Sequence, residues 1–376
     1  MTRGVTAPVR VGVVGCGVIS AAYLTNITAS AHIEVVACAD SVPERARERA
    51  AEFGVPRALS PDELLADPEV ELVVNLTVPT AHAPINLAAL SAGKHVYSEK
   101  PLATNREEGR MILDVAHAGA LQVGCAPDTF LGAGIQTCLL LMEQGELGEP
   151  LAATAFMLNG GPASWHPNAA FFYQPGAGPL FDVGPYYLTV LVCMLGPVRR
   201  VTGMSRVLYP EITPDRGPLA GHTLEVRTPT FVAALMEFEG GAQATLVTSF
   251  GISGHDLPNL HVYCTGGILA MPDPNTFGGP VRTRLNEEES AWSEVPLRYR
   301  HTDSRPPRNL RGIGVDEMAQ ALRHGEPPRA SGELAFHVLD VMEAIQESDS
   351  TGRHIELASR CRRPPLLPLD VSLAEM

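Results

Sequence analysis

Three features are missing from this sequence of 376 residues: a long apolar run, closely paired cysteines and a basic run. The longest apolar stretch, YYLTVLVCMLG, is much shorter than the ~18 residues that a membrane-spanning helix needs. The seven cysteines are scattered and never form a C-x-x-C pair, so neither a disulfide framework nor a zinc knuckle is predicted. The N-terminus leads straight into strand-like sequence without a cleavable pattern. We expect a cytoplasmic protein with reduced thiols and no membrane partner.

The charge balance excludes further partners. The formal net charge is −14, and neutralising phosphates requires clustered lysine and arginine, so nucleic acid and anionic membrane surfaces are not expected partners. The twelve histidines are dispersed, and His255, Asp256 and His261 come nearest to a metal cluster. Such residues are more often polar groups of loops and strands, so no metal is predicted. A hydrophobic content of 45% with 19% charged residues supports two well-packed domains.

The first third of the chain alternates strands and helices. Strand-like runs at 9–15, 33–40, 71–77, 95–99 and 121–125 are separated by helical patterns, and capping boxes are predicted at Ser60 with Glu63 and at Thr104 with Glu107. This alternation predicts a parallel sheet covered by helices on both faces. Beyond a helix at 135–144 the pattern changes to strand-like runs, two of them joined around Gly240 and Gly241 as a hairpin. We therefore predict an α/β protein with an N-terminal dinucleotide-binding domain at 1–128 and an α+β domain with a large antiparallel sheet at 129–376.

A glycine turn follows the first strand. The stretch VGVVGCGVIS supplies Gly15 and Gly17, with Ser20 in place of the usual third glycine, and Val18 and Ile19 open the following helix. Glycines allow a pyrophosphate to approach the backbone, and the helix N-terminus offers N–H groups to the anion. The alternative, an ordinary tight turn between strand and helix, is less favoured because an acidic residue ends the second strand 23 residues after Gly17. These residues predict a dinucleotide site.

That acidic residue, Asp40, can accept hydrogen bonds from the adenosine ribose and would repel a 2′-phosphate. NAD is therefore the expected cofactor, and NADP remains an alternative. Arg45 lies close enough in the sequence to approach a phosphate, although a solvated charge on the helix at 43–54 is the more ordinary reading.

Residues that leave neighbouring parallel strands meet at one edge of the sheet, where ligands of such folds bind. Thr77, Pro79 and His82 leave the strand at 71–77, and Glu99 and Lys100 leave the strand at 95–99. All five are predicted to lie beside the cofactor. A lysine followed by proline is usually a solvated charge next to a turn, but its position after this strand favours a functional ammonium. Desolvation at such a site would lower the pKa of that ammonium and allow proton exchange.

The sequence resembles the Gfo/Idh/MocA oxidoreductases, which include glucose-fructose oxidoreductase and inositol dehydrogenase. The resemblance spans nearly the whole chain and rests on four stretches: VGVVGCGVIS, NLTVPTAH, EKPLA and GPLFDVGPYYLTVLVCMLGPV. It implies a Rossmann domain, a C-terminal antiparallel sheet, hydride transfer on sugars, cyclitols or related diols, and homodimers or homotetramers formed through that sheet. It also implies that Lys100 touches both nicotinamide and substrate, and that the bond to Pro101 is cis.

Asp182 and Tyr186 are the candidates from the second half of the chain. They are four residues apart, so on one helix they would share a face. Many members of the resembled family have histidine where this chain has Tyr186, as the acid/base. The departure leaves the proton carrier open between Tyr186 and Lys100, because a phenol acts as a base only when cationic neighbours lower its pKa. The alternative is that Asp182 caps the helix and Tyr186 packs at the domain interface with a satisfied hydroxyl, so that neither takes part in the reaction.

The aromatic stretch ASWHPNAAFFYQPG precedes the aspartate in the sequence. Trp165 can stack on the C–H face of a sugar and His166 can bind hydroxyls, while simple loop packing is equally compatible with the pattern. Together these residues predict an NAD(P)-dependent dehydrogenase of a small polyhydroxylated substrate. Two alternatives remain: a sugar oxidoreductase or glycosidase-type enzyme that recycles a tightly bound nucleotide, and a dinucleotide-sensing regulator without turnover.

Overall fold

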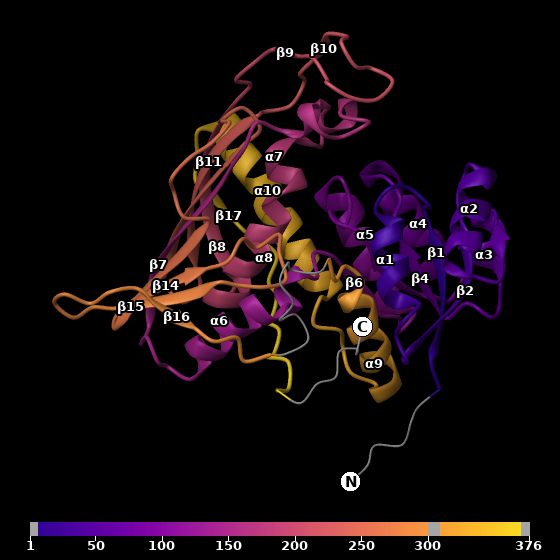
Figure 1. Ribbon diagram of the computed structural model, residues 1–376, viewed down its shortest axis with the longest axis horizontal. Helices are drawn as coiled ribbons and strands as arrows, with labels where there is room; N and C mark the ends of the chain where they lie inside the picture. The colour runs from indigo at the N-terminus through magenta and orange to yellow at the C-terminus, as the bar shows by residue number, and fades with distance from the viewer. Residues whose placement is uncertain (1–6, 300–308, 370–376) are drawn as a thin grey trace. The chain divides into compact units, whose positions relative to one another are not determined.

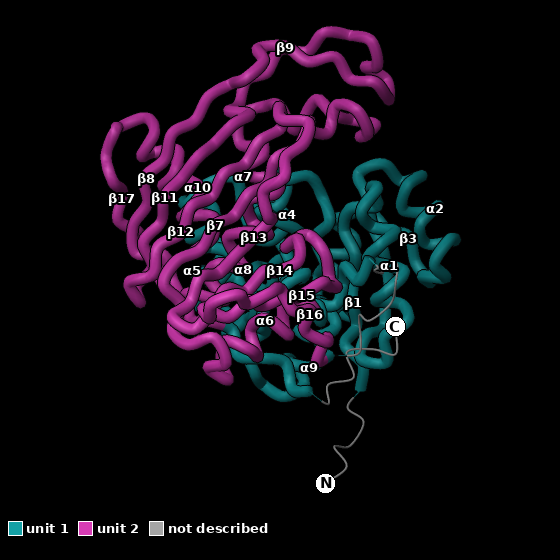
Figure 2. Tube along the Cα trace, turned by 60° about the vertical axis from the view of Figure 1, so that its left-hand side comes forward, with its two compact units in different colours: residues 1–133, 299–336, 364–376 teal, residues 134–298, 337–363 magenta. Residues whose placement is uncertain are grey.

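The computed structural model describes residues 7–299 and 309–369, and the chain forms two compact units. Unit 1 comprises Met1–Ala133, Tyr299–Phe336 and Pro364–Met376, and unit 2 comprises Gly134–Arg298 and His337–Arg363 (Figure 2). Each unit is thus assembled from separate stretches of sequence, which a single cut near residue 128 does not reproduce. The substrate-binding and oligomerisation roles assigned to residues 129–376 stay predictions.

Unit 1 contains the predicted parallel sheet. Its six strands have the order β3-β2-β1-β4-β5-β6, and every neighbouring pair is parallel. The order reverses between β1 and β4, which is the place where ligands of doubly wound sheets bind. The strands are β1 (Val9–Val14), β2 (Ile33–Ala39), β3 (Ala58–Leu59), β4 (Leu72–Asn75), β5 (His95–Ser98) and β6 (Val123–Cys125).

The helices of unit 1 begin where the sequence offers helix-starting residues. Ser60 and Glu63 form the predicted capping box. The box predicted at Thr104 with Glu107 is wrong: Asn105 is the cap and accepts a hydrogen bond from the Glu108 amide, while Thr104 donates to the Glu108 carboxylate. The helices are α1 (Ser20–Ile27), α2 (Pro43–Phe53), α3 (Pro61–Ala66), α4 (Pro79–Ser91), α5 (Arg106–Ala118), the 3₁₀ turn η1 (Thr129–Leu131) and α9 (Ile313–His324).

Helix α9 belongs to unit 1 although it lies far along the chain, and it packs against β6 and α1 (Figure 1). The amides of Gly312 and Gly314 donate hydrogen bonds of 2.8 and 3.1 Å to the carboxylate of Asp128. Asp128 is fully buried, and burial raises its pKa to about 6 against the opposing effect of these two donors. The amide of Cys125 also donates to the carbonyl of Ala330. The start of α9 is therefore held by the turn after β6, and the segment that follows α9 is held by the end of β6.

Unit 2 is built on a nine-stranded sheet with the order β16-β15-β14-β13-β7-β12-β11-β8-β17. All pairs are antiparallel except β7 with β12, so the predicted antiparallel sheet is mixed at one place. The hairpin predicted around Gly240 and Gly241 joins β11 to β12. The strands are β7 (Pro150–Leu158), β8 (Val198–Arg206), β11 (Phe231–Phe238), β12 (Gln243–Ser249), β13 (Leu260–Cys264), β14 (Gly267–Met271), β15 (Val281–Leu285), β16 (Ser293–Val295) and β17 (Ile355–Glu356), with a separate pair of β9 (Glu211–Ile212) and β10 (Leu224–Glu225).

Helices cover one face of the large sheet. They include α6 (Ala133–Glu143), α7 (Gly178–Asp182), α8 (Gly184–Leu195) and the part of α10 (Gly332–Thr351) that belongs to unit 2, with short 3₁₀ turns η2 (Pro162–Ser164) and η3 (Ala170–Tyr173). Every residue of α8 is buried. A helix that is apolar all round is typical of a protein core.

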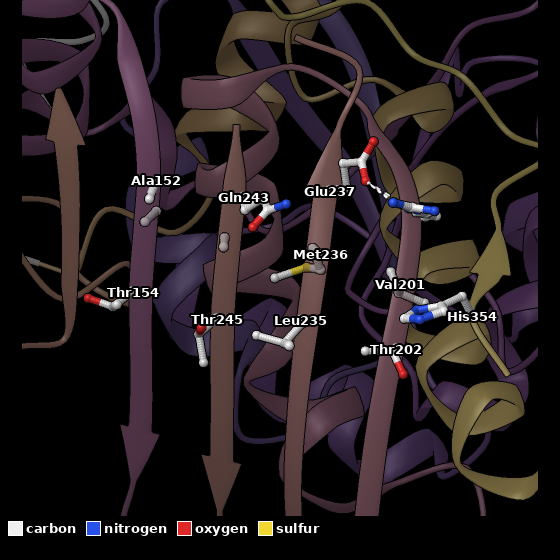
Figure 3. A pocket seen from close by; sticks show the side chains of 13 residues that line it. Ala152, Thr154, Val201, Thr202, Leu235, Met236, Glu237, Gln243, Thr245 and His354 are labelled. Carbon is white, nitrogen blue, oxygen red and sulfur yellow. Dashed lines mark hydrogen bonds and ion pairs between the residues drawn. The ribbon is translucent and has the colours of Figure 1, made fainter. Parts of the chain in front are cut away.

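The opposite face of the large sheet is open. Side chains along each strand alternate between buried and more exposed positions, and Met204 and Leu235 on the open side are 76% and 57% exposed. Figure 3 looks onto this face, where Thr154, Thr245 and Leu235 lie side by side on β7, β12 and β11 around a shallow hollow of about 320 Å³. Apolar and small polar groups dominate it. We call this surface the open sheet face.

Candidate functional site

The carboxyl ends of β1, β4 and β5 lie next to one another in unit 1, because these three strands are neighbours in the parallel sheet. The chain leaving them carries the glycine turn after β1, Thr77 after β4, and Glu99 and Lys100 after β5. The structure thus brings the predicted nucleotide-side residues to a single edge of the sheet, at the point where the strand order reverses.

Gly15 and Gly17 have different surroundings within the turn. Gly15 has a φ of +99°, and a Cβ placed on it would lie 2.6 Å from the carbonyl carbon of Leu76 and 2.7 Å from the amide nitrogen of Thr77. A Cβ on Gly17 would meet nothing within 4 Å. Gly15 therefore permits β1 and β4 to approach, whereas Gly17 keeps open the space in front of α1. That open cradle fits a pyrophosphate.

Val18, just before α1, is 72% exposed. Ile19 is the N-cap residue of α1, and its backbone dihedral angles are helical. The Ser20 hydroxyl donates a 2.6 Å hydrogen bond to the Gly17 carbonyl and accepts one from Arg49 of α2. Ser20, in the place of the third glycine, thus stabilises the turn through hydrogen bonds to Gly17 and Arg49. It leaves the space next to Gly17 open.

Asp40 is held firmly at the end of β2. One carboxylate oxygen accepts a 2.8 Å hydrogen bond from the Cys16 amide and the other accepts one of 2.8 Å from the Val42 amide. A carboxylate can accept about four hydrogen bonds, so capacity remains for ribose hydroxyls. Arg45 is exposed on the first turn of α2, two residues after that helix begins.

Thr77 and Pro79 form the start of the segment after β4. The amide and hydroxyl of Thr77 donate to the side-chain oxygen of Asn75, at 3.2 and 2.6 Å, and Pro79 is the first residue of α4. The Asn75 amide nitrogen donates in turn to the His82 carbonyl and to Asn86. Asn75 is fully buried and organises this segment. A lone asparagine inside the apolar run ELVVNLT is the sequence signal for such a role, since buried polar groups need partners.

Glu99 is buried, with 7% of its surface exposed. Its carboxylate accepts a 2.8 Å hydrogen bond from the Tyr23 hydroxyl and one of 2.9 Å from the Lys100 amide. Tyr23, on α1, is fully buried, and burial together with the Glu99 charge raises the pKa of the phenol. Tyr23 was not predicted as a site residue, because nothing in the sequence links it to a residue 76 positions away. The Lys100–Pro101 bond is cis, as the family resemblance implied.

His82 is buried as well, with 1% exposure. Its Nδ1 lies 2.6 Å from the Pro101 carbonyl oxygen and its Nε2 lies 3.1 Å from the Thr77 carbonyl oxygen. Burial lowers the pKa of the imidazole, although both carbonyls favour its protonated form. Both ring nitrogens are thus occupied by backbone oxygens of unit 1. The structure places His82 between two loops, as a support for Thr77 and Pro101.

In unit 2, Asp182 and Tyr186 do not share one helix as predicted. Asp182 is the last residue of α7, and α8 begins at Gly184 with Pro185 in its first turn. Proline has no N–H to continue the hydrogen-bond ladder, and the Tyr186 amide donates to the Val183 carbonyl in a tighter turn. Asp182 is partly exposed, and Tyr186 is buried with 6% exposure. The two side chains therefore flank a helix junction.

Trp165 and His166 lie in the aromatic loop of unit 2. Their ring centroids are 5.3 Å apart in an edge-on arrangement, and the His166 ring lies 4.9 Å from that of Phe172. Trp165 is 59% exposed, which leaves a large aromatic surface free for contact. Lys100 belongs to unit 1, whereas Asp182, Tyr186, Trp165 and His166 belong to unit 2. Their convergence stays a prediction.

The chain contains 28 lysines and arginines, and only two of these, Lys94 and Lys100, are lysines. Lys94 is 5% exposed and donates to the carbonyls of Asp67 and Val70. Wherever a surface cation suffices, this chain uses arginine. An ammonium at residue 100 therefore marks a position where a compact, titratable donor is used in place of a guanidinium.

Among residues 7–299 and 309–369, no group of three or more histidine, cysteine, aspartate or glutamate residues could hold a metal ion. In the same ranges, no helix combines the length and apolar character required to span a bilayer.

Comparison with known proteins identifies the family. Residues 9–125 match the sequence model described as "Oxidoreductase family, NAD-binding Rossmann fold", and residues 135–270 match the GFO/IDH/MocA C-terminal domain. The chain belongs to the Gfo/Idh/MocA oxidoreductase family. The dTDP-3,4-didehydro-2,6-dideoxy-alpha-D-glucose 3-reductase of Saccharopolyspora spinosa is 32% identical over 359 residues, which cover 92% of this chain and 98% of that protein.

Two other proteins are also similar to this chain. The mouse trans-1,2-dihydrobenzene-1,2-diol dehydrogenase is 29% identical over 287 residues, covering 75% of this chain and 79% of the relative. The structure of levoglucosan dehydrogenase in complex with NADH and levoglucosan superposes with a TM-score of 0.78 at 19% identity, over 94% of this chain and all of that one. The predictions of the family, of an NAD-binding Rossmann domain and of an oxidoreductase are confirmed.

Proposed function

We propose that this oxidoreductase transfers a hydride between NAD and a secondary alcohol or ketone of a sugar, cyclitol or related diol. The observation that carries the proposal is the position of Lys100, which leaves β5 at the edge where β1, β4 and β5 end together. It is one of two lysines in a chain that otherwise uses arginine. A dehydrogenase needs a donor that can gain and lose a proton at the reacting oxygen, and an ammonium can do this where a guanidinium cannot.

The nucleotide half of the site fits NAD. Gly17 leaves space for the pyrophosphate, Asp40 has acceptor capacity for the ribose hydroxyls, and Thr77 lines the segment next to the turn. The negative charge of Asp40 opposes a 2′-phosphate, which favours NAD over NADP. When bound, NAD supplies the acceptor or donor of the hydride.

Side chains of the protein transfer the proton and bind the substrate. Lys100 hydrogen-bonds the reacting oxygen, and Tyr186 carries the proton to or from it or shares that task with Lys100. Asp182 orients these donors. The proposal requires the ammonium of unit 1 and the acid and phenol of unit 2 to meet over the nicotinamide. Trp165 offers an exposed aromatic face to the apolar side of a ring, and His166 offers a ring nitrogen to its hydroxyls.

The relatives support this substrate class. The mouse protein is named for a dihydrodiol of benzene, the Saccharopolyspora protein for a deoxysugar nucleotide, and the structural neighbour holds levoglucosan with NADH. A hydroxylated six-membered ring is common to all three. We propose the same class of substrate for this chain.

The open sheet face supports self-association. Large apolar side chains there remain exposed across neighbouring strands, and contiguous apolar patches of this kind mark interaction surfaces. The cross-strand pair of Arg200 and Glu237 borders the patch and presents both charges, which suits packing against a second copy. We propose a homodimer or homotetramer formed through this face.

The activity is tested by a panel of sugars, inositols and diols with NAD and NADP, monitoring nicotinamide absorbance. Lys100→Met is expected to leave NAD binding nearly unchanged and to lower turnover by at least ~10²-fold. Arg47→Met is the matched control, because Arg47 is an exposed cation of unit 1 whose ion-pair partner is the equally exposed Glu44. Unchanged turnover in Lys100→Met would overturn the role of Lys100.

A second assay separates the proposed reaction from nucleotide recycling. Protein purified without added nucleotide is extracted and its bound NAD(H) quantified. We expect little bound nucleotide and a stoichiometric release of NADH during turnover. Stoichiometric bound nucleotide, with sugar conversion and no NADH release, would favour the recycling alternative.

A further inference from the structure

The backbone on the N-terminal side of Lys100 is held by a buried pair. The Lys100 amide donates to one oxygen of Glu99, and the Tyr23 hydroxyl donates to the other at 2.8 Å. Tyr23 is fully buried and Glu99 is 7% exposed, so water does not replace the phenol as donor. The Glu99 amide also donates to the Asn75 carbonyl at the end of β4. Helix α1 and strand β4 therefore both fix the residue that precedes the lysine.

The backbone on the C-terminal side of Lys100 is held by a second buried side chain. The His82 Nδ1 lies 2.6 Å from the Pro101 carbonyl oxygen, and its Nε2 lies 3.1 Å from the Thr77 carbonyl oxygen. The His82 carbonyl itself accepts from Asn75. The imidazole thus lies between the loop that carries the lysine and the loop that follows β4.

We propose that Tyr23 and His82 are positioning residues for Lys100, acting through Glu99 and the Pro101 carbonyl to fix the point from which the lysine side chain departs. This inference rests on the proposed function, because it assigns Lys100 to the reaction. Tyr23 and His82 are not catalytic residues: their polar groups are occupied within the protein.

The physical reason lies in the flexibility of lysine. Its ammonium stands at the end of four rotatable methylene groups, so the range of positions open to Nζ is narrow only when the backbone from which they depart is fixed. Displacements of about 1 Å can lower a rate ~10²-fold when reacting groups must align. Two buried contacts, one on each side of Lys100, restrict displacements of the backbone from which its side chain departs.

The His82 contacts also assign its proton. A neutral imidazole has one N–H, and burial lowers the pKa of His82, so only one of the two carbonyls accepts a hydrogen bond near neutral pH. The shorter contact, to Pro101, places the proton on Nδ1. Asparagine puts its amide close to the position of Nδ1, and leucine has no donor. His82→Asn should therefore retain the support of Pro101 and His82→Leu should lose it.

Tyr23→Phe removes only the hydroxyl that holds Glu99. Its matched control is Tyr97→Phe, since Tyr97 on β5 is equally buried and its hydroxyl has no hydrogen-bond partner among the described residues. Both substitutions delete one buried oxygen from unit 1. Their difference isolates the hydrogen bond to Glu99 from a general effect on the core.

The variants are compared by kinetics and by a readout that needs no substrate. Reductive ¹³C-methylation labels the N-terminus and the only two lysines, Lys94 and Lys100, so Lys100 gives a resolved methyl signal, assigned with Lys100→Arg. We expect Tyr23→Phe and His82→Leu to shift or broaden that signal and to lower kcat at least ~10-fold, with the NAD dissociation constant within about twofold. His82→Asn and Tyr97→Phe should resemble the wild type in both measurements.

Wild-type signals and rates in Tyr23→Phe and His82→Leu would overturn the inference, as would an effect of Tyr97→Phe equal to that of Tyr23→Phe. If no substrate supports turnover, the proposed function fails and the Lys100 signal alone decides whether these residues position it. Circular dichroism and thermal unfolding confirm that each variant compared is folded.

Discussion

Alanine should have opposite consequences at Gly15 and Gly17, although the two glycines belong to the same turn. At Gly15 the new Cβ would lie 2.6 Å from the carbonyl carbon of Leu76 and 2.7 Å from the amide nitrogen of Thr77. These are backbone atoms of the neighbouring β4 segment and cannot rotate away. At Gly17 the Cβ would enter open space. The first substitution therefore tests the fold, and the second tests the cofactor site.

The cost at Gly15 has two parts. A non-glycine residue at a φ of +99° is strained by about 1–3 kcal/mol. Overlap with packed atoms adds about 1–3 kcal/mol. The total of roughly 2–6 kcal/mol corresponds to a melting temperature lower by about 5–20 °C in a domain of this size. Gly15→Ala should show this loss in scanning calorimetry without any ligand.

Gly17→Ala carries neither cost. Alanine restricts the unfolded chain, so the apoprotein should be equal to the wild type or more stable by about 0.4–1 kcal/mol. The added methyl group would occupy the space expected for the pyrophosphate. NAD at a hundredfold excess over its dissociation constant stabilises a binding protein by about 2.7 kcal/mol. That stabilisation should be present in the wild type and absent in Gly17→Ala.

Two results would refute this reasoning. Full stabilisation of Gly17→Ala by NAD would show that the open space is not the pyrophosphate cradle. An unchanged melting temperature in Gly15→Ala would show that β1 and β4 do not approach as closely as the structure has them.

Three further predictions concern other parts of the molecule. Asp40→Asn removes a charged acceptor worth about 1.5–3 kcal/mol, so NAD should bind about 10- to 100-fold more weakly by titration calorimetry while NADP binding improves; unaltered selectivity would contradict the role of Asp40. Hydrogen bonding to buried Asp316 raises the pKa of His32 from 6.5. The contribution of this pair to the free energy of unfolding is therefore complete below pH 6.5 and is lost as the pH rises through the raised pKa. His32→Gln should abolish that pH dependence in urea unfolding, and an unchanged profile would exclude the contribution. Leu235→Glu on the open sheet face should reduce the mass found by light scattering to that of a monomer. Leu219→Glu is the control, because Leu219 is an exposed leucine between β9 and β10, and it should not change the mass. Equal masses for the two variants would rule out this interface.

Local sequence patterns were sufficient to predict which residues of unit 1 meet at the edge of the sheet. Strands that alternate with helices run parallel, so the residues after each strand must lie on the same side. The positions of Gly15, Asp40, Thr77 and Lys100 follow from this rule without knowledge of any side-chain contact. The predicted parallel sheet is confirmed for the same reason.

Contacts between distant residues could not be predicted in this way. Nothing local indicates that Tyr23 reaches Glu99, or that the His82 ring lies between the carbonyl groups of Pro101 and Thr77. The spacing of four residues between Asp182 and Tyr186 favours a single helix, but Pro185 lacks the N–H that would continue the hydrogen-bond ladder, and the helix breaks there. Thr104 and Asn105 could each cap a helix, and the cap is the residue whose side chain accepts from a backbone amide of the first turn; here that residue is Asn105, which accepts from the Glu108 amide.

The hydrogen bonds to Asp128 have a consequence for how the protein can be made and divided. A fragment that stops at Ala133 would bury a carboxylate whose two amide donors, from Gly312 and Gly314, are missing. During synthesis, Asp128 leaves the ribosome 184 residues before Gly312 and 186 residues before Gly314. The nucleotide-binding half should therefore reach its final stability only when the last quarter of the polypeptide has been translated, and a version of it intended for isolated study must retain that distal segment.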